Sequence, residues 1–254
     1  MLTFISCAKT MTNSSKVATP YATTPRYLDE AQRNALAMSQ FTTNELMSLL
    51  RVNSKIAAEN HLRYLRFAMD QQETLAALLA YTGVVFKHIN PEDFTMDDFR
   101  YAQDHLRITS FMYGLLRPLD RIDNYRMEGD LRLSIHDDRT MFESWREVLT
   151  RDFIEDIKAQ GGVLMNLASG EMKGLFDWRL IEKEVQVVTP EFKVWKSGKL
   201  STVVVYAKMC RGEMTRYILK NRIEDPTLLH DFEWEGFRFD PTRSDDRHYL
   251  FTME

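Results

Sequence analysis

Apolar residues recur at helical spacing in several parts of the chain. Thr42 and Glu45 form a capping-box pattern, and the leucines after them fall on one face, which predicts a helix from residue 43. Asn53 and Ser54 interrupt the pattern before a second apolar face continues to residue 68, so two helices joined by a short polar turn are expected. Further helices are predicted over residues 27–40, 74–81, 97–106 and 141–159.

Short apolar and β-branched runs predict the strands, at residues 2–6, 108–112, 163–167, 185–188, 200–206, 237–239 and 249–251. The runs Val163-Leu164-Met165 and Val203-Val204-Val205 lack the alternation of a half-solvated strand, so both of their faces should be covered. The chain has no internal repeat, low-complexity linker or sharp change of composition. These patterns predict a mixed α/β fold in one compact domain over residues 1–254, with a central mixed sheet flanked by helices.

The longest apolar run, residues 75–81, is far shorter than the roughly 18 to 20 residues that span a bilayer, so no membrane partner is expected. No basic leader precedes the first apolar residues, which favours a cytoplasmic location and free thiols at Cys7 and Cys210. Each cysteine has cationic neighbours that would favour a reactive thiolate, and the alternative is a pair of buried, inert thiols.

Charge is unevenly distributed along the chain. The 33 Lys and Arg against 37 Asp and Glu, a net charge of -4, exclude a protein whose whole surface attracts nucleic acid. Residues 1–27 and 208–222 are nevertheless cationic, while residues 224–254 and the cluster Glu92, Asp93, Asp97 and Asp98 are acidic. The basic segments are either solvated faces or the parts of a local polyanion site.

The sequence lacks the standard phosphate-loop, dinucleotide, serine-hydrolase and zinc-protease motifs. Its six histidines have no ligand spacing, so we expect no metal site and no cofactor. The acidic cluster at residues 92–98 lies at a predicted helix start, where acids complement the helix dipole. Because no Glu-x-x-His pair occurs, direct iron chelation is not expected.

Residues 100–151 hold nine Arg, no Lys and nine acids. Arginine suits bidentate binding of phosphate or carboxylate and pairing in partly buried places. The stretch therefore contains either internal Arg–carboxylate pairs that brace the loops around Pro118 or an anion site.

Five blocks carry a resemblance to a known family: Ser6-Cys7-Ala8-Lys9-Thr10, His105-Leu106-Arg107, Tyr113-Gly114-Leu115-Leu116-Arg117-Pro118-Leu119-Asp120, Asn166-Leu167-Ala168-Ser169, and Arg211-Gly212 with Met214 and Arg216. From residue 1 to about residue 251 the chain resembles the YaaA peroxide-stress-response family. The resemblance implies a cytosolic bacterial protein that protects against hydrogen peroxide, partly by limiting free iron. It also implies duplex DNA binding in a positively charged cleft with a helix-hairpin-helix element, and no established reaction.

The chain departs from the family pattern at a few positions. Cys7 replaces a common Pro, Val84 and Phe86 replace an Asp and a Tyr, and Phe111-Met112 replaces Gly-Leu. A mechanism that needs an acid at position 84 is therefore not expected here.

Our leading hypothesis is a DNA-binding protein of the peroxide stress response that contacts phosphates with little sequence preference. A helix-hairpin-helix-like element near residues 43–67 would direct backbone amides at phosphate, although an ordinary helical hairpin fits the sequence equally well because the turn lacks glycine. If residues 213–222 are helical, Arg216 and Lys220 share one face and line a cleft. The predicted DNA-binding residues are Lys9, Asn53, Ser54, Lys55, Lys173, Lys208, Arg211, Arg216 and Lys220, and the further anion-binding candidates are Ser6, Arg107, Arg117, Asn166 and Ser169.

The alternative is an enzyme acting on a small phosphate-bearing or nucleotide-like substrate in a basic pocket around Lys9. Several polar residues of the matching blocks stand at the ends of predicted strands, where α/β folds place their sites. A lysine desolvated among cations would serve as base or nucleophile. A groove of duplex width would favour DNA, and a closed pocket of a few hundred Å³ a small ligand. Under either hypothesis, any link to iron homeostasis is expected to be indirect, through DNA or a partner.

Overall fold

The computed structural model describes residues 1–69 and 74–254. Its strands are β1 (Leu2–Ile5), β2 (Leu75–Ala76), β3 (Leu106–Ser110), β4 (Gly114–Leu116), β5 (Arg121–Ile122), β6 (Val163–Asn166), β7 (Gln186–Lys196), β8 (Lys199–Ser201), β9 (Arg238–Phe239) and β10 (His248–Met253). Its α-helices are α1 (Leu28–Ser39), α2 (Thr43–Leu50), α3 (Ser54–Ala68), α4 (Ala77–Ala80), α5 (Val84–Ile89), α6 (Met96–His105), α7 (Met141–Ala159), α8 (Trp178–Glu184) and α9 (Val204–Asn221). Short 3-10 helices are η1 (Pro91–Asp93), η2 (Ser134–His136), η3 (Gly170–Leu175) and η4 (Pro226–Asp231).

Most strands join one mixed sheet in the order β4-β3-β1-β6-β7-β10-β9, with β8 paired to β7. The five strands β3, β1, β6, β7 and β10 are mutually parallel, while β4, β8 and β9 add antiparallel edges. The central strand β1 is buried along its whole length, as its apolar sequence predicts. The prediction of a single α/β domain built on a central mixed sheet is confirmed.

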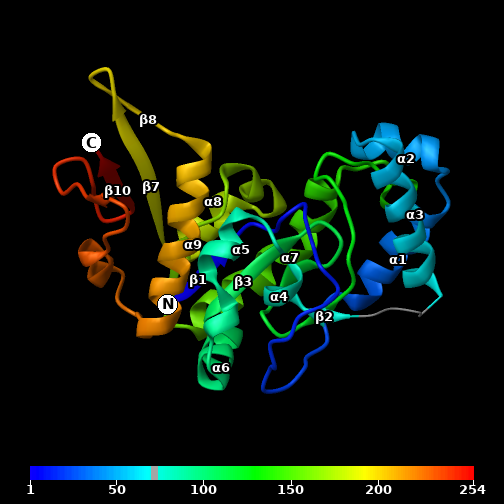
Figure 1. Ribbon diagram of the computed structural model, residues 1–254, viewed down its shortest axis with the longest axis horizontal. Helices are drawn as coiled ribbons and strands as arrows, with labels where there is room; N and C mark the ends of the chain where they lie inside the picture. Colours follow the sequence, from blue (N-terminus) through cyan, green and yellow to red (C-terminus); the bar gives the residue numbers. More distant parts are fainter. Residues whose placement is uncertain (70–73) are drawn as a thin grey trace.

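Two groups of helices flank this sheet. Helix α9 packs against α5, α6 and β7, while α7 packs against η3, α8 and β6. On the α7 side, the Phe4 ring of β1 lies 5.0 Å from Phe153 and 5.6 Å from Phe176. Helices α1, α2 and α3 form a separate lobe at the end of the molecule opposite β7, β8 and β10 (Figure 1).

The α2–α3 hairpin has the expected local geometry. Thr42 caps α2 in a complete capping box with Glu45, and the Asn53 side chain caps α3 by accepting from the Ile56 amide at 3.0 Å. Between them Arg51 takes a left-handed conformation with φ of 53°, so the turn is made without glycine. The two helices and their polar turn are confirmed, and whether they bind DNA as a helix-hairpin-helix motif stays a prediction.

Two predicted elements are wrong. The strand predicted at residues 200–206 is wrong beyond Ser201, where β8 ends. Helix α9 begins at Val204, so the run of three valines stands at a helix start. Helical spacing of the buried residues Ala207, Cys210, Met214 and Ile218 outweighs the β propensity of that run, and Val204 and Val205 are exposed. Residues 74–81 contain a two-residue strand and one helical turn instead of a continuous helix.

The remaining boundaries differ less. The strand expected at residues 108–112 begins at Leu106, and the one expected at 185–188 runs on to Lys196. The short elements β4, β5, α5 and α8 were not predicted. No helix in residues 1–69 or 74–254 is both long and apolar enough to cross a membrane.

Candidate functional site

A pocket lies where the parallel strands β3, β1 and β6 end. The chain leaves β1 to reach β3 on one side, and it leaves β6 to reach β7 on the other side. Such a switch in direction opens a crevice at the carboxyl ends of two neighbouring strands, which is the usual ligand position in open α/β sheets. The residues that follow β1 and β6 therefore meet in this crevice.

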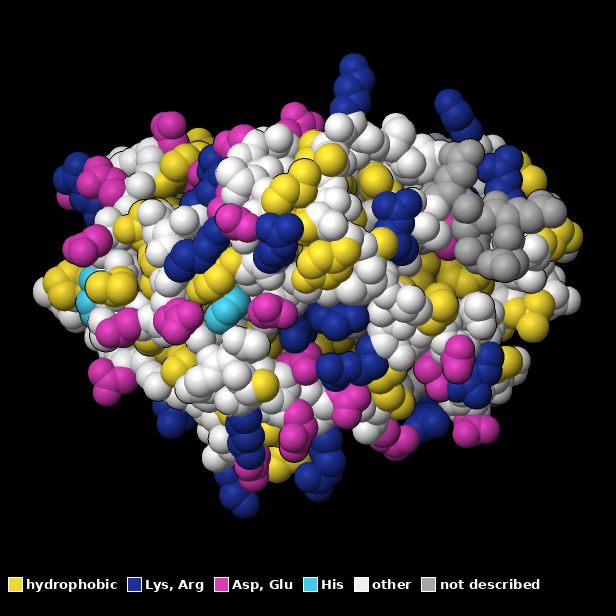
Figure 2. Space-filling model, turned by 90° about the horizontal axis from the view of Figure 1, so that it is seen from below, with side chains coloured by type: hydrophobic (Ala, Val, Ile, Leu, Met, Phe, Trp, Pro, Cys, Tyr) yellow, Lys and Arg dark blue, Asp and Glu magenta, His cyan; other side chains and the backbone are white. Residues whose placement is uncertain are grey.

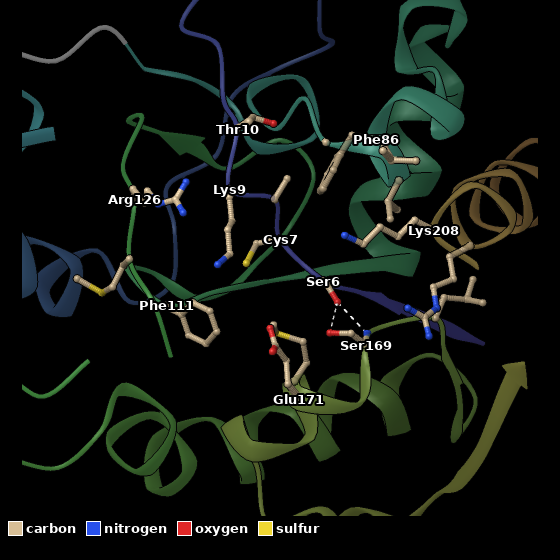
Figure 3. Close-up of a pocket in the computed structure, with 18 of the residues that line it drawn as sticks. Ser6, Cys7, Lys9, Thr10, Phe86, Phe111, Arg126, Ser169, Glu171 and Lys208 are labelled. Atoms are coloured by element: carbon tan, nitrogen blue, oxygen red, sulfur yellow. Dashed lines mark hydrogen bonds between the residues drawn. The ribbon is translucent and has the colours of Figure 1, made fainter. Parts of the chain in front are cut away.

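The pocket has a volume of about 360 Å³, which falls in the range of small-molecule sites. Its lining comes from five parts of the chain that are far apart in sequence (Figure 3). These are residues 6–10, residues 83–86 of the α5 start, Phe111 with residues 125–127, residues 167–172 of the β6–η3 segment, and Lys208 and Arg211 of α9.

Two serines form its floor. Ser6 follows β1 and Ser169 precedes η3, and the Ser169 amide donates to the Ser6 hydroxyl at 2.8 Å. The two hydroxyls lie 3.2 Å apart and both face the pocket (Figure 3). The hydrogen bonds hold the loops after β1 and β6 together and leave hydroxyl groups for a ligand.

Two cations of helix α9, Lys208 and Arg211, lack an ion-pair partner among the described residues. Lys208 and Arg211 form no ion pair and no side-chain hydrogen bond with any residue that the structure describes, and the Arg211 Nε is buried without an acceptor. Burial lowers the pKa of the Arg211 guanidinium, because Glu191 opposes the desolvation only from beyond ion-pair distance. A half-buried cation without a counterion is costly, and an anion in the pocket would supply the missing partner.

Close packing of α9 on α5 positions these cations. A Cβ at Gly212 would lie 2.4 Å from the Val85 carbonyl oxygen and 2.6 Å from the His88 Cβ, so only glycine allows this approach. His88 Nδ1 also lies 2.8 Å from Glu213 Oε1 across the same contact. Since α5 and α9 both line the pocket, the Gly212 contact sets its width.

The opposite side of the pocket holds two cations, Lys9 and Arg126, that share one carboxylate, Glu128. Lys9 Nζ donates to Glu128 Oε2 at 2.6 Å, and Arg126 lies 3.2 Å from the other Glu128 oxygen. The Lys9 side chain is 63% exposed, so it is not the desolvated lysine that nucleophilic catalysis needs. The geometry leaves Lys9 as an exposed cation in the pocket lining, and its binding role stays a prediction.

The remaining polar wall contains Glu171, Cys7 and Tyr125. Glu171 is exposed and points into the pocket (Figure 3). Burial raises the pKa of Cys7 to about 11 and that of Cys210 to about 12, and both cysteines are free, so the inert-thiol alternative fits better than the reactive one. The Tyr125 hydroxyl is already bonded to Tyr81 and Ser110, at 2.8 and 2.7 Å.

Arg216 and Lys220 do not line this pocket. Arg216 binds Asp93 through both terminal nitrogens, and Lys220 donates to Asp98 at 2.9 Å. These ion pairs fasten α9 to the segment around η1 and α6. Charge reversal at the two positions would break the ion pairs, so a loss of DNA binding in such variants would not identify a contact.

The anion-binding candidates Arg107, Arg117 and Asn166 also serve the fold. Arg107 is buried, pairs with Asp156 at 2.7 Å and donates to carbonyls at the end of α6. Arg117 pairs with Asp120 at 3.1 Å, as the internal-pair interpretation of the loops around Pro118 expects. Asn166 is buried and bonds Thr189.

The other predicted DNA contacts lie apart from the pocket lining. Lys173 lies over the Trp178 ring, 4.9 Å from its centroid. Asn53, Ser54 and Lys55 are exposed at the start of α3, in the separate lobe. Of the predicted binding residues, the pocket brings together Ser6, Lys9, Ser169, Lys208 and Arg211.

Sequence reasoning missed Arg126, Glu171, Phe86 and Phe111 as pocket residues. Three positions that depart from the family pattern, Val84, Phe86 and Phe111, line the pocket together with a fourth, Cys7. That shared departure was the clue available in the sequence. In residues 1–69 and 74–254 no three His, Cys, Asp or Glu side chains are arranged to hold a metal ion.

Charge is mixed on one face of the molecule. On the face seen from below the view of Figure 1, Lys and Arg side chains alternate with Asp and Glu (Figure 2). Positive charge on this face is thus confined to small groups of side chains. In the pocket, positive charge is concentrated at Lys208 and Arg211, which form no ion pair with the described residues.

Comparisons with known proteins agree over nearly the whole chain. The family described as "Peroxide stress protein YaaA" matches residues 1–243. A UPF0246 protein of Phocaeicola vulgatus is 65% identical over 100% of this chain and 99% of its own length. UPF0246 protein BF3795 of Bacteroides fragilis is 61% identical, with 99% and 98% covered, and a UPF0246 protein of Porphyromonas gingivalis is 46% identical, with both chains covered in full.

Proposed function

Because the chain belongs to the YaaA family of peroxide stress proteins, we propose that it serves the oxidative stress response by binding a small phosphate-bearing molecule in the Lys9 pocket. The observation that carries this proposal is Arg211, a half-buried guanidinium that forms no ion pair in the described part of the chain. Beside it in the lining stands the exposed Lys208. The pocket volume of about 360 Å³ supports a small ligand over a duplex.

The chemistry of the wall specifies phosphate. Guanidinium and ammonium groups together with serine hydroxyls are the donors that bind phosphate oxygens most strongly. Ser6, Ser169, Lys208 and Arg211 supply four such donor groups from three chain segments. The proposal covers binding and includes no catalytic step.

Titration calorimetry with inorganic phosphate and with ribose 5-phosphate tests this function. Arg211→Met should weaken the binding of both ligands roughly tenfold or more, because it removes a charge-assisted contact worth about 1.5–3 kcal/mol. Arg247→Met, which removes an exposed cation outside the pocket, controls for net charge. Failure of the wild type to bind either ligand would overturn the proposal.

A cellular test links the pocket to the stress response. Bacteria whose own gene is deleted and complemented with Arg211→Met should survive hydrogen peroxide as poorly as the uncomplemented deletion strain, at equal protein level. The Arg247→Met protein should restore survival. Full rescue by Arg211→Met would separate the pocket from the stress role.

Binding of duplex or structured DNA through phosphates is the second candidate. It is favoured by the exposed start of α3, where Asn53, Ser54 and Lys55 are accessible and the first turn carries no acid. In gel shifts on a random duplex, the logarithm of the DNA affinity should fall linearly with the logarithm of the salt concentration. Lys55→Glu should weaken binding to all DNA sequences alike. A DNA affinity that does not depend on salt, or one that Lys55→Glu leaves unchanged, would contradict this candidate.

A further inference from the structure

The two ends of the pocket differ in chemistry. Ser6, Ser169 and Lys208 lie together at one side, while Phe111 and Arg126 lie at the other (Figure 3). A phosphate held by the first group would leave the rest of its molecule directed toward the second. The second group therefore determines what the phosphate is attached to.

Glu171 supplies an acceptor between the two ends. It is exposed on η3, points into the pocket (Figure 3), and forms no hydrogen bond or ion pair with other residues in the described ranges. Glu171 also lies close enough to Cys7 to affect its thiol. The pKa of Cys7 is raised first by burial and further by the Glu171 charge. An ionised carboxylate only accepts hydrogen bonds, so its partner in a ligand must be a donor, such as a hydroxyl or an amine.

Phe111 supplies a rigid apolar wall. Its ring packs edge-on against Phe142, with centroids 5.2 Å apart and planes at 86°. Gly129 allows this packing, because a Cβ there would lie 2.4 Å from the Phe142 ring and 2.7 Å from the Phe111 ring. Phe111 and Met127 line the pocket but are only 6% and 4% exposed, so they offer a flat ring the edge of a fixed apolar surface.

We propose that the ligand is a nucleoside monophosphate, bound with its phosphate at Ser6, Ser169, Lys208 and Arg211, its sugar hydroxyls at Glu171 and its base against Phe111. This rests on the phosphate-binding function proposed above and names its ligand class. A carboxylate is a common acceptor for ribose hydroxyls in nucleotide sites. A volume of about 360 Å³ suits one nucleotide unit.

Calorimetry with AMP, ribose 5-phosphate, adenosine and inorganic phosphate tests the assignment. Wild-type protein should bind AMP more tightly than ribose 5-phosphate, and ribose 5-phosphate more tightly than inorganic phosphate. Glu171→Gln should weaken AMP binding roughly tenfold or more, because a charge-assisted contact to the sugar is lost. Because Glu171 is exposed, we expect the variant to fold. Glu155→Gln, which removes an exposed acid of α7 outside the pocket, is the matched control.

The same variant separates recognition from plain electrostatics. Removing a negative charge near the cations should leave inorganic phosphate binding unchanged or strengthen it, while AMP binding falls. If Glu171→Gln strengthens the binding of both AMP and inorganic phosphate, Glu171 is only a nearby charge and the assignment is wrong. If inorganic phosphate and AMP bind equally well to the wild type, the nucleoside part is not recognised, and the phosphate-binding function alone survives. If neither binds, that function fails as well.

Discussion

The two halves of helix α9 carry the same kind of charge and use it differently. In the second half, Arg216 and Lys220 bind the carboxylates of Asp93 and Asp98, with N–O distances of 2.7 and 2.9 Å for the best-aligned contacts. In the first half, Lys208 and Arg211 face the pocket without an acidic partner among the described residues. The sequence shows one basic segment, whereas the structure divides it into cations that hold the fold and cations available to a ligand.

The largest expected effect lies in the paired half, at Asp98. Its side chain is 8% exposed, binds Lys220 and Arg222, and completes the capping box of α6. Asp98→Asn removes the carboxylate that these two cations share, while Lys220 keeps its contact with Asp93. It should lower the free energy of unfolding by about 2–3 kcal/mol, less than for a fully buried pair because both cations are partly exposed. Urea unfolding measures this. Asp97→Asn, at an 81% exposed acid in the same turn, should change stability by less than about 0.5 kcal/mol.

The same carboxylate predicts a pH dependence. Burial alone would raise the pKa of Asp98, but hydrogen bonds from Lys220, the Thr95 amide and Arg222 hold it well below its ordinary value. A group with a depressed pKa in the folded state stabilises the fold above its unfolded pKa, roughly 3.9, and loses that contribution as the pH falls further. Wild-type stability should therefore fall more steeply below about pH 4 than that of Asp98→Asn. Parallel curves would show that Asp98 is not responsible.

The next effect lies at the contact that joins both halves to the pocket. Gly212→Ala places a Cβ against the Val85 carbonyl, so α5 and α9 must separate, and overpacking of this kind costs about 1–3 kcal/mol. Phosphate affinity should fall together with stability, because both helices line the site. Gly170→Ala is the control: it lies between Ser169 and Glu171, and its added Cβ would meet no atom within 4 Å. Equal behaviour of the two variants in unfolding and calorimetry would show that the close packing does not position the site.

A pair of arginine variants compares the two halves directly. Arg216→Met should lower stability by about 1 kcal/mol, the value of a partly exposed bidentate pair, and leave phosphate affinity within about twofold. Arg211→Met should do the opposite, because removing a desolvated charge leaves stability unchanged or higher by up to about 1 kcal/mol while phosphate affinity falls. Thermal unfolding and calorimetry on both variants measure this. If Arg211→Met proved less stable than Arg216→Met, the division of α9 into cations that hold the fold and cations available to a ligand would be wrong.

Local pattern predicted the parts of this fold that depend on neighbours in sequence. The capping box at Thr42 places α2, and continuous apolar runs place β1 and β6. Propensity failed at Val203–Tyr206, where burial of the face containing Cys210 and Met214 decides for a helix.

The part of the candidate site that follows the predicted strand ends could be predicted from the sequence. Ser6 and Ser169 follow parallel strands, and their meeting in a crevice follows from the rule for α/β sheets. Which cations remain free did not follow, because Asp93 and Asp98 lie more than 100 residues from the α9 cations that they pair with. Glu171 gave no indication at all, since one exposed acid in a sequence resembles any other.

The smallest expected effect concerns Val84, at the start of α5 in the pocket wall. Val84→Asp adds a carboxylate on the same wall region as Lys208 and Arg211, and a like charge beside a bound phosphate opposes its binding. We expect phosphate affinity to fall about three- to tenfold, equivalent to about 0.7–1.4 kcal/mol, with stability changed by less than about 1 kcal/mol because Val84 is only partly buried. The isosteric Val84→Thr, which adds no charge, should bind phosphate as the wild type does. An Asp variant that keeps full affinity would mean that the phosphate lies away from α5 and closer to Lys9, so the unpaired half of α9 would no longer define the site.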